Sequence, residues 1–341
     1  MKSISKKKLF DSNFVQKQTN KDLKKHIYHN ILKNIKNFKY GKSIIKLRNK
    51  KKNNKNSIII AAGPSIKNND QTKILKKYRK YYNIVACDSA LFYLLKNDIV
   101  PDLVISCDPD EKRILRWFGD KNLTVEDLKK DDYFERQDLD SDFKDQIKNN
   151  KKVIKKLDKY KGKLKIALCT SVSKKVFLRI KELKFKIFWW NPYLDDESSN
   201  SSLTKKIYKI NKFPLINTGG NVGTSSWNIT DTVLNSSKNA LVGFDFSYYI
   251  DLPIKSTQYY DSLKYHFGKK GLNNFYKKIY NPIIKKHFYT DHVYHWYKKC
   301  LIEMLEFSEN KTFNCTGGGI LFEGRIIWSS LKNFCKSFKN G

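Results

Sequence analysis

The feature that most constrains the fold is a series of short, wholly apolar runs, each of which ends in a polar or glycine-containing turn. The first run, Ser57 to Ala62, has the sequence SIIIAA and stops at Gly63-Pro64. A short apolar run without alternation is typical of a strand that is buried on both faces of a parallel sheet. Comparable runs follow at Ile84 to Cys87, Leu103 to Cys107, Leu164 to Cys169, Phe185 to Trp190 and Asn239 to Val242.

Amphipathic helical stretches lie between most of these runs. They include Gln71 to Tyr81, Ser89 to Lys96 and Ser173 to Leu183. Strands that alternate with helices in this way indicate βαβ units, and consecutive βαβ units form a sheet whose strands are mostly parallel. The sequence therefore predicts the α/β class, with a Rossmann-like, doubly wound, mostly parallel sheet.

Composition and periodicity divide the chain into three predicted parts. Residues 1–55 are rich in Lys and Asn and form an N-terminal helical leader, residues 56–250 form the α/β domain, and residues 251–341 form a C-terminal helical cap. The leader contains Ile27, Ile31, Ile35 and Phe38 at helical spacing, and the cap has helical periodicity from Val293 to Phe307.

A charged insertion is predicted within the α/β domain at about residues 120–160. The stretch from 120 to 145 has a net negative charge, opposite to the net charge of the chain. We expect it to form an exposed helical insertion or a mobile lid rather than a metal cluster. Its ten carboxylates are Asp120, Glu126, Asp127, Asp131, Asp132, Glu135, Asp138, Asp140, Asp142 and Asp145.

The net charge of +35 suggests an anionic ligand, but the type of basic residue argues against specific nucleic-acid binding. Of the 68 basic residues, 7 are Arg and 61 are Lys. Proteins that recognise base sequence depend on Arg for bidentate contacts. The same charge attracts anionic small molecules or an anionic membrane surface, so a nucleotide-type ligand and peripheral membrane association are the favoured partner classes.

Other features of the composition limit the location and the redox chemistry. The chain has no run of 18 apolar residues, and the apolar stretch in the start MKSISKKKLF is too short for a secretory signal. We therefore expect a cytoplasmic protein. Its six cysteines include no CxxC pair, which favours buried free thiols over a disulfide framework or a zinc site.

Polar residues follow the predicted strands at the carboxyl ends, where open α/β sheets bind their ligands. Glycine at such a turn lets the backbone approach a ligand, and a following serine offers a hydroxyl and free amides. The alternative is a tight turn between strand and helix. The residues at these ends are Gly63, Pro64 and Ser65, then Asp88 and Ser89, then Asp108, Pro109 and Asp110, and finally Gly243, Phe244 and Asp245.

A glycine-rich loop before the helical run WNITDTVL is a second candidate for holding a phosphate or carboxylate. It offers backbone amides, hydroxyls and the positive end of a helix dipole. It matches neither a Walker A loop nor GxGxxG. The alternative is that Thr224 or Ser225 only caps the helix. The candidate ligand-binding residues of this loop are Thr218, Gly219, Gly220, Gly223, Thr224 and Ser225.

Three aspartates and three histidines are candidates for catalysis. Asp88, Asp108 and Asp245 could hold Mg²⁺ or ribose hydroxyls, or could cap the helices that follow them. A histidine of the C-terminal cap could act as general base, with a tyrosine hydroxyl beside a leaving phosphate. These histidines are His287, His292 and His295, among Tyr289, Tyr294 and Tyr297, and a further glycine-rich turn follows at Asn314 to Gly319.

Taken together, four ordered motifs resemble the MptE-like domain family, which includes the motility accessory factor (Maf) proteins. The motifs are SIIIAAGPSIKNN, IVACDSALFYLLKNDIVPDLVISCDPD, NTGGNVGTSSWNIT and ALVGFDFSYY. The leader (YHNILKNI) and the tail (DHVYHWYKKC, NCTGGGILFEG) also look like the Maf type, so the resemblance covers roughly residues 26–330.

The resemblance implies a transferase with a sialyltransferase-like core. A Maf-like protein would transfer a nonulosonic (sialic-like) acid from a CMP donor to a hydroxyl of a protein such as flagellin or of a glycan. In the similar sialyltransferases an NGPS loop and a downstream Asn hold the cytidine nucleotide. This chain departs from that pattern, with Ala62 in place of the first Asn and Asp88 at the downstream position.

We retain three functional hypotheses from the sequence. In the glycosyltransferase, Ser65 and the 219–225 loop hold the donor phosphate, Asp88 binds ribose, and Asp108, Asp245 or His292 serves the chemistry. In a 6-hydroxymethyl-7,8-dihydropterin diphosphokinase, Asp88 and Asp108 would instead bind Mg²⁺ and neutralise the polyphosphate of ATP. The third hypothesis is a nucleotide-binding module without catalysis.

Overall fold

The main sheet is parallel throughout the part of the chain that the structure, a computed structural model, describes. That part comprises residues 12–48, 56–67, 69–129, 143–260, 263–264 and 268–338. The strand order is β1-β6-β5-β4-β3-β2-β8-β12-β13, with β7 paired to β6 beside this path. The strands are β1 (Gly41–Ser43), β2 (Ser57–Ile60), β3 (Asn83–Cys87), β4 (Leu103–Ser106), β5 (Lys165–Cys169), β6 (Lys186–Pro192), β7 (Leu215–Ile216), β8 (Lys238–Val242), β12 (Lys311–Asn314) and β13 (Ile327–Trp328).

All six apolar runs form strands of this sheet, and helices cover both of its faces. In β2, Ile58 and Ile60 belong to one hydrophobic cluster and Ile59 belongs to another. Successive side chains of a strand point to opposite faces, so a strand covered on both sides must be apolar at every position. The predicted α/β class and the doubly wound, parallel arrangement are confirmed.

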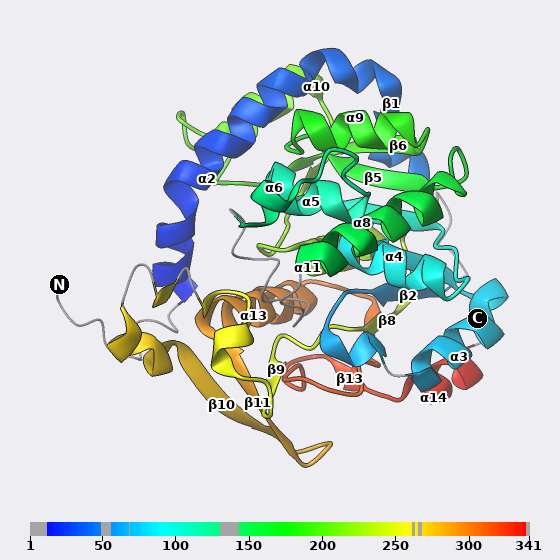
Figure 1. The fold of residues 1–341 in the computed structure, drawn as a ribbon, viewed down its shortest axis with the longest axis vertical. Coiled ribbons are helices and arrows are strands. Elements are labelled where there is room, and N and C mark those ends of the chain that lie inside the picture. Colours follow the sequence, from blue (N-terminus) through cyan, green and yellow to red (C-terminus); the bar gives the residue numbers. More distant parts are fainter. Residues whose placement is uncertain are drawn as a thin grey trace.

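The helices divide between the two faces of the central strands. Side chains of α3 and α14 lie in one hydrophobic cluster, and side chains of α11 and α13 lie in the other. Figure 1 shows this layering around β2 and β8. The helices are α2 (Ser12–Asn34), α3 (Asn69–Tyr78), α4 (Asp88–Lys96), α5 (Glu111–Trp117), α6 (Val125–Lys129), α8 (Phe143–Asp158), α9 (Lys174–Glu182), α10 (Leu203–Asn211), α11 (Val222–Asn228), α13 (His292–Glu306) and α14 (Leu331–Ser337).

Shorter helical turns join these elements. One of them, the π-helical turn η5, continues directly from the end of α11. The others are 3-10 turns. They are η1 (Ile35–Tyr40), η2 (Ile44–Leu47), η3 (Pro64–Lys67), η4 (Arg79–Tyr81), η5 (Ile229–Val233), η6 (Ile254–Ser256) and η7 (Lys269–Phe275).

The predicted helix of the N-terminal leader is α2. Its buried positions Ile27 and Ile31 pack against Ile207 of α10. The Asn30 side chain donates hydrogen bonds to the carbonyl oxygens of Pro109 and Ser171, at 3.1 and 2.9 Å. These carbonyls follow β4 and β5, so α2 is fixed across the carboxyl end of the sheet, and Figure 1 shows it along the outer edge.

The segment after residue 250 contains the expected helices α13 and α14, and it also contains strands. β12 and β13 extend the main sheet beyond β8. β10 (Tyr276–Asn281) and β11 (Lys286–Asp291) form an antiparallel hairpin that pairs with β9 (Tyr248–Tyr249) in a second, three-stranded sheet. The predicted cap is thus built into both sheets.

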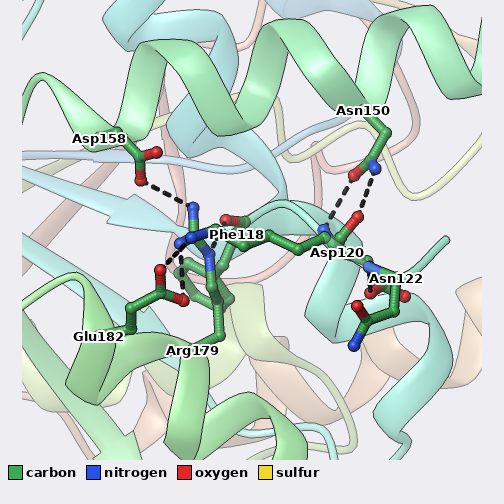
Figure 2. Close-up of polar contacts among 8 residues, drawn as sticks. Phe118, Asp120, Asn122, Asn150, Asp158, Arg179 and Glu182 are labelled. Atoms are coloured by element: carbon green, nitrogen blue, oxygen red, sulfur yellow. Dashed lines mark hydrogen bonds and ion pairs between the residues drawn. The ribbon is translucent and has the colours of Figure 1, made fainter.

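The start of the charged insertion is fastened to the helices around it. The backbone of Asp120 exchanges two hydrogen bonds with the side chain of Asn150 in α8, at 2.9 and 2.6 Å. Arg179 of α9 donates to the carbonyl of Phe118 and pairs with Asp158 and Glu182 (Figure 2). The described part of this segment contains the helices α6 and α8. Residues 130–142, which carry several of the predicted carboxylates, lie outside the described residues.

The six cysteines are free, and four of them are buried. This agrees with the expectation of isolated thiols in the core. Among the helices that the structure describes, none combines the length and the apolar content needed to cross a bilayer.

Candidate functional site

The candidate site lies where the direction of strand succession changes. Strands β3, β4, β5 and β6 extend from one side of β2, and β8 lies on the other side. Ligands of open α/β sheets bind beyond the carboxyl ends of the strands at such a switch point. Across it, the Ser65 hydroxyl donates a hydrogen bond of 2.7 Å to the Asp245 carboxylate, and this bond joins the turns after β2 and β8.

A cavity of ≈1270 Å³ opens at this end of the sheet. This volume exceeds the usual range for a single small-ligand pocket, about 300–1,000 Å³. Most of the predicted site residues line it together, from five separate segments of the chain. They are Gly63, Pro64, Asp88, Ser89, Asp108, Thr218, Gly219, Gly220, Gly223 and Asp245.

Asp245 is the most unusual group in the cavity. It is only 2% exposed, and its Oδ2 atom accepts the bond from Ser65. Its Oδ1 atom accepts no hydrogen bond from any other group that the structure describes. Burial raises the pKa of Asp245 to about 7, although the hydrogen bonds from Ser65 oppose the shift. A buried carboxyl with a free oxygen and a pKa near neutrality can give or take a proton.

Glycines enclose Asp245 so closely that no side chain fits in their place. A Cβ atom on Gly63 would lie 2.0 Å from Oδ2 of Asp245. A Cβ atom on Gly319 would lie 2.2 Å from the Asp245 carbonyl oxygen, and Gly319 also has a φ of +77°. The glycine-rich turn at 314–319 therefore forms one wall around this aspartate.

Asp88 is equally buried, but both of its carboxylate oxygens have partners. Oδ1 accepts from the backbone amide of Ser89 and Oδ2 accepts from the Ser106 hydroxyl, each at 2.7 Å. Burial raises the pKa of Asp88 to about 7. These contacts tie the first residue of α4 to the end of β4, but Asp88 does not cap the helix, because the cap position is Cys87.

Asp108 is half-buried and lies beside an aromatic residue. Its Oδ1 atom accepts from the amide of Asp110 at 2.8 Å. Burial raises the pKa of Tyr297 to about 12, and the charge of Asp108 adds to that shift. Asp108 and Tyr297 therefore form a polar corner of the cavity.

The glycine-rich loop before α11 presents its backbone to the cavity. Gly219 and Gly220 have φ values of +54° and +84°, and a Cβ atom on Gly220 would lie 2.5 Å from Trp296. The Asn221 side chain caps α11 by accepting from the amide of Thr224 at 2.9 Å. The structure describes no acceptor for the amides of Val222 and Gly223, which line the cavity. Free amides at a helix start suit a phosphate or carboxylate oxygen.

Two of the loop residues do not reach the cavity. Thr224 and Ser225 are completely buried. The Thr224 hydroxyl accepts from the Asn221 side chain, and the Ser225 hydroxyl donates to the Asn221 carbonyl at 2.8 Å. Asn221 is the cap and therefore decides where α11 begins. In the resulting helix the hydroxyls of Thr224 and Ser225 are buried in the protein and do not face the cavity.

The turn after β2 differs from expectation, because its amides are already used. The Gly63 amide donates to Gly243 at 2.9 Å, and the Ile66 amide donates to Gly63 at 3.1 Å. The Ser65 amide, like its hydroxyl, donates to Asp245. This turn positions Asp245 and offers the cavity few free donors.

The predicted histidines are not part of the cavity wall. His292 packs against Phe275, and burial lowers its pKa to about 4. His295 is buried in α13, and His287 is exposed on the β10–β11 hairpin. The role of His292 as a base stays a prediction that its position does not favour.

An aromatic wall, formed by Tyr259, Tyr294, Trp296 and Tyr297, lines the cavity beside the glycine loop, and the sequence indicated only part of this region. Tyr294 and Tyr297 stand among the tyrosines noted beside the histidines, but Gln258 did not stand out. The Gln258 side chain accepts from the Tyr294 hydroxyl and donates to the Tyr259 hydroxyl. The backbone amide of Gln258 donates to the Tyr248 hydroxyl. No local pattern marks Gln258, because its bond to Tyr294 joins positions 36 residues apart in the sequence.

The charges of the cavity are mixed. Lys24 of α2 and Lys67 of η3 contribute to its lining, together with the aspartates. No cluster of three or more His, Cys, Asp or Glu side chains that could hold a metal ion occurs among residues 12–48, 56–67, 69–129, 143–260, 263–264 and 268–338. A divalent ion at Asp88 and Asp108 would need further oxygen ligands from a phosphate group or water.

Comparison with known proteins agrees with the resemblance seen in the sequence. Residues 29–124 match the family model described as 6-hydroxymethylpterin diphosphokinase MptE-like. The fold is similar to that of the Maf glycosyltransferase from Magnetospirillum magneticum AMB-1, with a TM-score of 0.56 and 12% sequence identity. That similarity covers 93% of this chain and 42% of the other, so the chain spans less than half of that protein. No curated protein sequence matches the chain.

Proposed function

We propose that this protein is a glycosyltransferase that uses a nucleotide-activated sugar. The observation that carries the proposal is the convergence of Asp245, the glycine loop and the aromatic wall on one large cavity at the switch point. The fold similarity to a Maf glycosyltransferase supports it. A transferase must hold a donor and an acceptor together, and the volume of the cavity suits two ligands better than one.

The donor phosphate would bind at the glycine loop. There the free amides of Val222 and Gly223 meet the positive end of the α11 dipole. Lys24 and Lys67 would attract the negative charge of the donor. The ribose would lie against Ser89, beside Asp88, whose own oxygens already have protein partners.

Asp245 would act as the general base. In the transfer, the bond between the anomeric carbon and the donor phosphate oxygen breaks, and the acceptor oxygen forms a bond to that carbon. The acceptor hydroxyl proton passes to Asp245, and the nucleotide leaves with the electron pair of the broken bond. A base with a pKa near 7 suits this task, since about half of it is ionised at neutral pH and the ionised form still accepts a proton readily.

In its finer form, the proposal is Maf-like transfer of a nonulosonic acid from a CMP donor to a hydroxyl of a protein or glycan. Calorimetric titration with CMP and with a CMP-nonulosonate tests it, and we expect micromolar binding that does not require Mg²⁺. Absence of binding by both ligands would remove the basis of the proposal.

A diphosphokinase is the second candidate, because the matched family model carries that description. Asp88 and Asp108 both line the cavity and would share Mg²⁺ with the phosphates of ATP. This hypothesis requires tight ATP binding that disappears when Mg²⁺ is removed. Thermal shifts with CMP, CDP, UDP and ATP, each with and without Mg²⁺, distinguish the two enzymes. A protein that binds a nucleotide but turns over none would fit the non-catalytic module.

A further inference from the structure

The β10–β11 hairpin extends beyond the rest of the ribbon at the bottom of Figure 1. We call residues 277–287, which make up most of the hairpin and include its turn, the hairpin tip. Tyr280 and Ile283 are 48% and 46% exposed there, among the highest values for large apolar residues that the structure describes. Pro282 between them is exposed as well. Large apolar side chains at the end of a projection are placed to meet something other than water.

The hairpin tip is strongly basic. Its exposed lysines are Lys277, Lys278, Lys285 and Lys286. No acidic residue occurs in the sequence between Asp261 and Asp291. The partner of this surface must therefore carry negative charge.

The tip is held rigidly to the body of the protein. The buried side chain of Asn281 donates to the Gly319 carbonyl at 2.8 Å. Its oxygen accepts from the amides of Ile283 and Ile284, at 3.0 and 3.3 Å, and so fixes the turn. Because the turn is already ordered, docking through it costs little conformational entropy.

Neither folding nor charge alone explains this combination of residues. β10 is an edge strand, and lysine on an edge prevents pairing with another copy, which accounts for Lys277 and Lys278. It does not account for the exposed Ile283, or for Tyr280, whose ring packs against His287 across the hairpin and is still 48% exposed. A nucleic acid or an acidic protein would use the lysines but would gain little from Ile283 at the point of the turn. An anionic bilayer uses both, because its surface attracts lysine and its interface accepts apolar and aromatic side chains.

We propose that the hairpin tip docks this protein on an anionic lipid bilayer. Tyr280 and Ile283 enter the headgroup region, and the four lysines contact lipid phosphates around them. This is peripheral attachment and involves no segment that crosses the bilayer. The inference does not depend on the proposed enzymatic activity.

Co-sedimentation of the full chain with lipid vesicles tests the proposal. We expect binding to vesicles of 70% phosphatidylcholine and 30% phosphatidylglycerol, and much weaker binding to pure phosphatidylcholine. Each lysine near such a surface strengthens binding about fivefold. Replacing Lys277, Lys278, Lys285 and Lys286 by Gln should weaken binding at least about 20-fold after allowance for screening by salt. The double change Tyr280→Ser and Ile283→Ser should weaken it about 10-fold with the net charge unchanged.

Matched controls separate the hairpin tip from the general positive charge. Gln at the exposed Lys159, Lys161, Lys163 and Lys165 removes the same charge elsewhere. The pair Leu32→Ser and Ile35→Ser removes equally exposed apolar side chains from the basic N-terminal arm. Both controls should bind vesicles within about threefold of the unchanged protein. If either control weakens binding as much as its hairpin counterpart, the hairpin is not the docking site.

Two further measurements bear on how the tip is used. An Ile283→Trp variant should be quenched by brominated phosphatidylcholine in mixed anionic vesicles, whereas Leu32→Trp should show only the quenching of the native tryptophans. Equal quenching of both would contradict insertion of the tip. A labelled DNA duplex provides the remaining comparison: loss of DNA binding in the four-lysine variant with vesicle binding intact would assign the surface to nucleic acid and overturn the proposal.

Discussion

The ends of β3 and β8 look alike in the sequence and differ in the structure. Each strand is followed by an aspartate, and Asp88 and Asp245 are both 2% exposed. Asp88 has a protein partner for each oxygen, whereas Asp245 keeps Oδ1 free of any partner in the described chain. One aspartate therefore completes the fold, and the other remains available to a ligand. Equal burial does not imply equal function.

The largest expected effect comes from Asp245→Asn. Asn keeps the size and can still accept from Ser65, but it cannot take a proton. We expect transfer to fall about 10³-fold, within the range measured for general bases, while nucleotide affinity stays within a few-fold. Asp88→Asn is the matched control, because its amide can satisfy both Ser89 and Ser106, and should lose less than about tenfold. Equal losses in the two variants would end the distinction between the two strand ends.

A substitution next to Asp245 tests how tightly that end is packed. In Gly319→Ala the new methyl group would meet the Asp245 backbone at a positive φ, and we expect a loss of about 3 kcal/mol in the free energy of unfolding. Gly162→Ala is the control, since Gly162 has a similar φ of +73° and nothing within 4 Å of the added atom. It should cost about 1 kcal/mol. Denaturant unfolding measures both, and similar losses would mean that only backbone strain matters.

The raised pKa values of the two aspartates predict how stability depends on pH. The folded carboxyl groups have pKa values of about 7, above the ordinary aspartate value of 3.8. Between these values the folded chain holds more protons than the unfolded chain, so their contribution to stability falls as pH rises from about 4 to 7. The slope for Asp245 is at most about 1.4 kcal/mol per pH unit. Asp245→Asn should flatten the unfolding free energy across this window, and an unchanged slope would show that burial does not perturb this carboxyl.

The smallest effect is expected from removing the hydroxyl that contacts each aspartate. Ser65→Ala takes away a donor that favours the ionised form of Asp245, so its pKa should rise further. The rise of transfer rate with pH should move about one pH unit upward. Ser106→Ala removes the equivalent donor of Asp88 and should leave that profile in place. A profile that shifts with Ser106 instead would identify Asp88 as the base.

Much of the fold follows from the sequence, because strands covered on both faces are apolar at every position. β12 escaped prediction since its sequence KTFN carries one large apolar residue, Phe313, and its position in the sheet depends on pairing with β8. The hairpin escaped for a related reason: the lysines of YKKIYN interrupt its alternation. Strands that rely on a neighbour, rather than on their own hydrophobicity, leave a weak local pattern.

The candidate site was predictable only in part. The chain positions that follow buried strands converge because parallel strands share one edge, and this accounts for Asp88, Asp108 and Asp245. The direction of a side chain within a helix depends on where the cap lies, so Thr224 and Ser225 could not be excluded beforehand. The exclusion of His292 from the cavity depends on how α13 packs, which no local pattern contains.

The position of β12 has a practical consequence for dividing this protein. Cutting the chain after residue 250, where the composition changes, would strip β8 of its outer neighbour and leave a hydrophobic edge open to aggregation. It would also delete the turn that covers Asp245. The carboxyl would then be exposed to water, and its pKa would fall toward the ordinary value for aspartate. Residues 56–250 and 251–341 are thus one inseparable unit, and a shortened version would misreport both solubility and ligand affinity.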